Sequence, residues 1–169
     1  LRQRHNSDLG NDLGNLLRRS LAMLARYRDG LVPEPPATSE LSERFADLPA
    51  TVRDHVAALR FREALDEIWV LVSALNRAID ERKPWELYKQ ERGLELDALL
   101  YELCEGLRWL STLLFPFMPN KSTEIWRQLG LAGSPECRWA DELQWGRLAP
   151  GTQTVPGEPL FPRLEPTPA

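Results

Sequence analysis

Three polar side chains recur at every fourth position near the start of the chain, at Asn11, Asn15 and Arg19. In a helix this spacing places them in one narrow stripe, roughly 150° from the leucines of the same segment. We therefore expect them to point away from the core. Asparagine and arginine present planar groups that form paired hydrogen bonds with the edges of nucleic-acid bases. An ordinary solvated helix face is the alternative interpretation of this pattern.

A tryptophan follows a proline in the stretch DERKPWELYKQ of residues 80–90. Pro84 stops the preceding helix and suits the first position of a new one, so it turns Trp85 away from the direction that a continuous helix would give it. The ring could pin two helix ends together by apolar contact. It could also be a platform on which unpaired bases stack. The sequence leaves both interpretations open and does not place Trp85 near Asn15.

The residues that commonly perform catalysis or bind metals do not cluster in the sequence. Cys104 and Cys137 are far apart, and His5 and His55 are isolated, whereas a structural zinc site needs four converging ligands. Most carboxylates fall at helix positions where we expect solvent. The chain is therefore expected to bind rather than catalyse, with no cofactor and no metal of its own.

Size and charge set broad limits. The 169 residues carry a formal charge of −4, which argues against a protein that coats nucleic acid through a global positive field. Residues 1–30 nevertheless hold six arginines against three aspartates, a local basic surface that suits a selective acidic partner. Without a signal peptide or a membrane-spanning apolar run, a cytoplasmic location and no membrane partner are expected. The first residue is leucine, which indicates a piece of a longer protein.

The spacing of apolar residues predicts an all-α bundle of five or six helices. The expected helices cover residues 6–29, 61–83, 84–91, 94–114 and 120–129, with Asn120 as the cap of the last. A further helix is expected to start at a cap, Thr38 or Ser39, and to reach past residue 54 with a break at Pro49. The clearest apolar stripe runs along the helix over residues 61–83, through Phe61, Leu65, Ile68, Val72, Leu75 and Ile79.

The composition changes after residue 131, where proline and glycine become frequent. Leu160 and Phe161 lie between prolines, which predicts an extended arm docked on a surface. We therefore predict a helical domain over residues 1–131 and an irregular arm over residues 132–169.

Four blocks of the sequence resemble the C-terminal half of the methionyl-tRNA synthetase family, in that family's order. They are NSDLGNDLGNLLRRSLAMLARYRDGLVP, ALDEIWVLVSALNRAIDERKPWELYK, LYELCEGLRWLSTLLFPFMPNKSTEIWRQLGL and EPLFPRLE. The pairing of NDLGNLL with a downstream PW is the specific part. The resemblance implies an α-helical anticodon-binding domain whose partner is a tRNA with the anticodon CAU.

The resemblance also assigns roles to the residues singled out above. Asn15 and Arg19 would contact the anticodon, Trp85 would stack on its first base, and Asn11 and Pro84 would contribute as a neighbour on the stripe and as the group that orients the ring. The segment 160–163 resembles the arm that packs at the junction with the catalytic domain. That domain would be a further partner, because the HIGH and KMSKS motifs and the zinc-binding insertion of the family are absent from this sequence. ATP, magnesium and methionine would belong to the parent enzyme.

Two alternatives remain. The anticodon domain of another class I synthetase would need different base-contacting residues. A helical protein-interaction module would use Trp85 as a structural pin.

Overall fold

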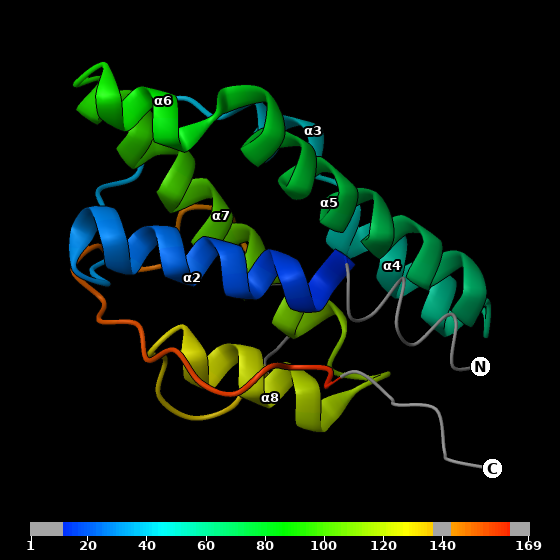
Figure 1. Cartoon of the computed structure of the whole chain (residues 1–169). Coiled ribbons are helices and arrows are strands. Elements are labelled where there is room, and N and C mark those ends of the chain that lie inside the picture. The colour runs from blue at the N-terminus through cyan, green and yellow to red at the C-terminus, as the bar shows by residue number, and fades with distance from the viewer. Residues whose placement is uncertain (1–11, 137–142, 163–169) are drawn as a thin grey trace, which may run out of the picture.

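The computed structural model describes residues 12–136 and 143–162 (Figure 1). Within these ranges the fold is all-α, as predicted, and the only extended pairing is an isolated antiparallel bridge between Leu31 and Gln153. The helices are α2 (Asn15–Arg28), α3 (Glu40–Arg44), α4 (Leu48–Ala57), α5 (Phe61–Arg82), α6 (Pro84–Lys89), α7 (Gly93–Leu113) and α8 (Pro119–Gln128). A wider, π-type turn over residues 12–14 leads into α2.

Helix α7 is the centre of the bundle, with α2, α5, α6 and α8 packed against it (Figure 1). Every residue of α7 from Leu99 to Leu113 is buried. The sequence predicted a leucine stripe here and solvated carboxylates, and for Glu102 and Glu105 that expectation is wrong, because they are only 4% and 0% exposed. A helix covered on all sides also buries its polar positions, and these must find internal partners.

The predicted stripe of α5 is buried from Ile68 to Ile79. Its first member is an exception, since Phe61 is 48% exposed. Phe61 opens the helix directly after an exposed turn, and its ring meets the ring of Phe117 edge-on, with 6.3 Å between the centroids. Position in the stripe alone therefore overestimated its burial.

Local signals set most helix ends. The hydroxyl of Ser39, one of the two caps that the sequence offered with Thr38, accepts a hydrogen bond from the backbone N–H of Ser42 and caps α3. The break expected at Pro49 falls slightly earlier, and Pro49 lies in the first turn of α4. Asn120 does not cap α8, because Pro119 takes the first helical position and Met118 precedes it. Proline's fixed φ angle favours that first position.

The segment 143–162 lies along the bundle (Figure 1). Leu143, Leu148, Leu160 and Phe161 are all buried, so the expectation that Leu160 and Phe161 dock on a surface agrees with their burial. Residues 151–154 run antiparallel to residues 30–32 and are joined to them by backbone hydrogen bonds. The division of the chain at residue 131 stays a prediction.

A buried ion pair ties this segment to α7. Arg108 donates two hydrogen bonds to the carboxylate of Glu105, at 2.8 and 2.7 Å. The same carboxylate accepts hydrogen bonds from the backbone N–H groups of Gly146, Arg147 and Leu148, at 2.8, 3.2 and 3.2 Å. One buried charge thus receives five donors, which is how a charge becomes tolerable in a core.

Replacing Glu105 with glutamine should lower the free energy of unfolding by about 2–4 kcal/mol, because Arg108 would keep its buried charge without a counter-ion. Urea denaturation measures this loss. Glu91→Gln is the matched control, since Glu91 is exposed, and it should change stability by less than about 0.5 kcal/mol. A loss below about 1 kcal/mol for Glu105→Gln would show that the buried ion pair contributes little to stability.

Tyr101, one turn before Glu105 in α7, contacts the same C-terminal segment. Its hydroxyl donates to the carbonyl oxygen of Leu148 at 3.0 Å. Burial, followed by the nearby carboxylate of Glu105, raises the pKa of Tyr101 to about 12. The folded protein therefore holds this proton at a pH where the unfolded chain has released it.

Stability that depends on Tyr101 should be present below about pH 10 and should be lost as the pH rises towards 12, because only the unfolded chain ionises easily in that window. Tyr101→Phe should be less stable than the wild type at pH 7, where the hydrogen bond is missing, and the difference should narrow between pH 10 and 12. Chemical denaturation of both proteins across this range tests the sign. A difference that is constant with pH would contradict the assignment.

Candidate nucleic-acid interface

Helix α2 runs alongside α5 and α6 in the same chain direction (Figure 1). Three contacts fix the alignment. The side-chain amide of Asn76 donates to the carbonyl oxygen of Asp12 at 3.3 Å, and Arg19 pairs with Asp80 at 2.9 Å. Further on, the rings of Tyr27 and Tyr88 stack with 4.7 Å between their centroids. Trp85 lies in the chain between Asp80 and Tyr88, whose side chains contact Arg19 and Tyr27 of α2.

The predicted polar stripe of α2 is less exposed than its angle suggested. Asn15 and Arg19 are both partly buried, and the most exposed positions nearby are Arg18 and Ala22. The reason is that α2 packs against two neighbours, α7 and α5, so that the stripe faces the flank of α5 rather than open solvent. Asn11 lies outside the described residues.

Both described members of the stripe have charged partners. The side-chain oxygen of Asn15 accepts a hydrogen bond from Arg18 at 2.8 Å. The guanidinium of Arg19 donates to the carboxylate of Asp80 at 2.9 Å, with side chains 30% and 65% exposed. A surface pair of this kind contributes little to stability. It does restrict the direction in which Arg19 presents its remaining donors.

The joint between α5 and α6 sets the direction of Trp85. Lys83 ends α5 in a left-handed conformation with φ of 45°, and Pro84 then opens α6 with its ring buried. Trp85 follows and is 41% exposed. A tryptophan that only pinned two helix ends would be expected to be buried, so this exposure favours the platform interpretation.

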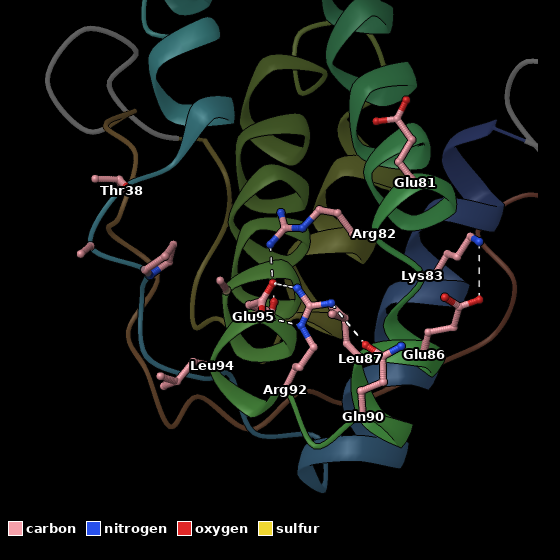
Figure 2. A pocket seen from close by; sticks show the side chains of 13 residues that line it. Thr38, Glu81, Arg82, Lys83, Glu86, Leu87, Gln90, Arg92, Leu94 and Glu95 are labelled. Atoms are coloured by element: carbon pink, nitrogen blue, oxygen red, sulfur yellow. Dashed lines mark hydrogen bonds and ion pairs between the residues drawn. The ribbon is translucent and has the colours of Figure 1, made fainter.

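A cavity of about 560 Å³ lies beside the joint between α5 and α6 (Figure 2). It is lined mainly by residues 36–38, the end of α5, α6 and the start of α7. Most of its charges are paired, Lys83 with Glu86 and Arg92 with Glu95 within the lining, and Arg82 with Glu102 outside it. The hydrogen bonds from Arg92 lower the pKa of the Glu95 carboxyl. Because these pairs neutralise most of the charges, the cavity offers a ligand little free charge.

Two residues of the candidate interface, Asp80 in α5 and Tyr88 in α6, were not identified from the sequence. Asp80 could not be matched with Arg19 because they are 61 positions apart. Tyr88 could have been identified, because it stands three positions after Trp85 and therefore on a neighbouring part of the same helix surface.

Across residues 12–136 and 143–162, no group of three or more histidine, cysteine, aspartate or glutamate side chains is placed to hold a metal ion. None of the helices in these ranges has the length and apolar character needed to cross a membrane.

The chain matches known proteins along nearly its whole length. The sequence model of the family described as "Anticodon-binding domain of tRNA ligase" matches residues 39–148. The methionine–tRNA ligase of Caldanaerobacter subterraneus subsp. tengcongensis is 43% identical over 168 residues, which cover 96% of this chain and 26% of that protein. That of Enterococcus faecalis is 41% identical over 169 residues, covering 96% and 25%.

A solved structure of the same kind of enzyme has the same fold. The apo form of methionyl-tRNA synthetase from Mycobacterium tuberculosis superposes with a TM-score of 0.85 and 33% identity, over 97% of this chain and 34% of that one. With this helical bundle and these matches, the chain belongs to the family of anticodon-binding domains of tRNA ligases. Within that family it corresponds to the domain that methionine–tRNA ligases carry. It spans about a quarter of the length of the curated relatives it matches.

Truncating Trp85 to alanine should lower the free energy of unfolding by clearly less than truncating a fully buried tryptophan, because 41% of Trp85 is already in solvent. Trp109→Ala is the matched comparison, since Trp109 is 2% exposed, and it should cost about 3–5 kcal/mol. Urea denaturation of both variants measures the contrast. An equal loss in the two variants would identify Trp85 as a structural pin.

Proposed function

We propose that the face formed by α2 and α6 binds the anticodon loop of a tRNA and recognises the sequence CAU. The observation that carries the proposal is an exposed tryptophan, Trp85, that stands in the chain between two residues in contact with α2, Asp80 and Tyr88. An aromatic ring next to planar hydrogen-bonding side chains is suited to unpaired bases, which stack on the ring and expose their edges. Membership of an anticodon-binding family supports the same assignment.

The chemistry of each residue and the family resemblance together suggest its role. Trp85 stacks on the first anticodon base, and Pro84, which is buried, acts by fixing the direction of that ring. Asn15 and Arg19 offer planar groups to base edges. Asn11 would extend this stripe by one turn on the basis of its spacing in the sequence.

The ion pair between Arg19 and Asp80 suits recognition of bases rather than phosphates. A free arginine is attracted to any phosphate, whereas the Asp80 carboxylate offsets that charge and directs the guanidinium. Affinity from phosphate contacts would then come from the other arginines of residues 1–30. Phosphate contacts position the RNA, and base contacts specify it.

The parent enzyme would attach methionine to this tRNA, with ATP and magnesium bound by its catalytic domain rather than by this chain. The domain described here would hold the tRNA so that its acceptor end reaches that active site. Such a role belongs in the cytoplasm, and Cys104 is a free, buried thiol that requires no oxidising compartment.

The direct test is fluorescence anisotropy of a labelled anticodon stem-loop titrated with this chain at one low salt concentration. The wild type should bind the CAU loop more tightly than a loop with a changed first base. Trp85→Ala should weaken binding of the CAU loop by about 5- to 100-fold and remove the preference, because the stack is lost.

Phe61→Ala is the matched control, since Phe61 is a comparably exposed aromatic far along the chain from α6. It should leave binding unchanged. Equal binding of both loops by the wild type would contradict CAU recognition. No binding of either loop would favour a helical protein-interaction module instead.

A further inference from the structure

Helix α6 exposes two aromatic side chains on one flank. Trp85 is 41% exposed and Tyr88 is 53% exposed. They are three positions apart, so their directions differ by about 60° around the helix axis. Glu86 and Gln90 line the cavity on the other flank (Figure 2), and the lining of that cavity includes neither aromatic residue. Tyr88 faces α2, where it meets Tyr27, and Trp85 lies about 60° away from it on the helix surface, outside the cavity lining.

Tyr88 is held from beneath by α2. Its ring stacks on that of Tyr27 with 4.7 Å between centroids and 29° between the planes. The guanidinium of Arg26 lies 5.5 Å from the centroid of the Tyr27 ring. This arrangement fixes the orientation of Tyr88 and leaves half of its surface in solvent. An aromatic pair used only to join two helices would gain more by burying both rings.

We propose that Tyr88 is a second stacking surface, which takes a base adjacent to the one that stacks on Trp85. This inference rests on the proposed function and extends it by one nucleotide. Side chains three positions apart on a helix have Cβ atoms about 5–6 Å apart, a spacing that neighbouring nucleotides span when their bases are splayed. Stacking on tyrosine tolerates any base, so Tyr88 contributes affinity and order to the loop, while base identity is tested elsewhere.

The cation near Tyr27 supports the same occupant. Arg26 is exposed and directly precedes Tyr27 in α2. Its positive charge would attract the phosphate backbone of a nucleotide that stacks on Tyr88. A protein partner with an apolar surface would gain nothing from this charge. An RNA strand gains both the stack and the phosphate contact.

The experiment uses CAU stem-loops with 2-aminopurine at one nucleotide on either side of the first anticodon base. Each loop is titrated with the wild-type chain, Tyr88→Phe, Tyr88→Leu and Tyr27→Leu. Tyr88→Phe retains the ring and should behave as the wild type. Tyr88→Leu should weaken binding by about 5- to 100-fold and, at saturation, leave one of the two probes brighter than in the wild-type complex, because the stacked base is released.

Tyr27→Leu separates stacking on RNA from stacking between helices. It removes the contact between α2 and α6 but keeps the exposed ring of Tyr88, so the probe should stay quenched and most of the affinity should remain. The inference is overturned if Tyr27→Leu and Tyr88→Leu lose affinity equally with no change at either probe. It is also overturned, with the proposed function intact, if Trp85→Ala weakens binding and Tyr88→Leu does not. If the wild type binds no loop, both proposals fail together.

Discussion

The complete burial of α7 is the constraint on which the other elements depend. From Leu99 to Leu113 this helix has no solvent-facing side, so its polar side chains must be satisfied from neighbouring segments. Glu105 is satisfied by Arg108 and by three backbone N–H groups of residues 146–148. Glu102 is satisfied by the hydroxyl of Ser39 and by Arg82. Each buried carboxylate thereby holds a distant part of the chain against the central helix.

The carboxylate of Glu102 links the core to the candidate interface. Arg82 is the last residue of α5, and the left-handed Lys83 and the buried Pro84 follow directly. The ion pair of the partly exposed Arg82 with the buried Glu102 therefore helps to fix the point from which the chain turns towards Trp85. The same carboxylate accepts the hydroxyl of Ser39, which also caps α3. The exposed ring is presented from a joint that the core anchors on both sides of the turn.

The interface itself combines weak interactions with fixed geometry. The pair of Arg19 with Asp80 and the stack of Tyr27 with Tyr88 are partly exposed, so neither adds much to stability. Together they align α2 with the end of α5 and with α6, which gives the planar group of Arg19 and the ring of Tyr88 a fixed spacing. Recognition of a flexible strand benefits from this order, because the protein side of the contact needs little rearrangement on binding.

The sequence by itself determined the helical class, most helix limits and the family resemblance, and narrowed the cap of α3 to Thr38 or Ser39, because these depend on periodicity and on neighbouring residues. It also singled out Asn15, Arg19, Pro84 and Trp85. Tertiary structure decided the rest. It buried Glu102 and Glu105 because α7 is covered on all sides, left Phe61 exposed at the start of α5, and turned Arg19 towards Asp80. A helical pattern fixes angles around one axis, whereas burial and pairing depend on which helices lie beside it, and only the packed bundle specifies those neighbours.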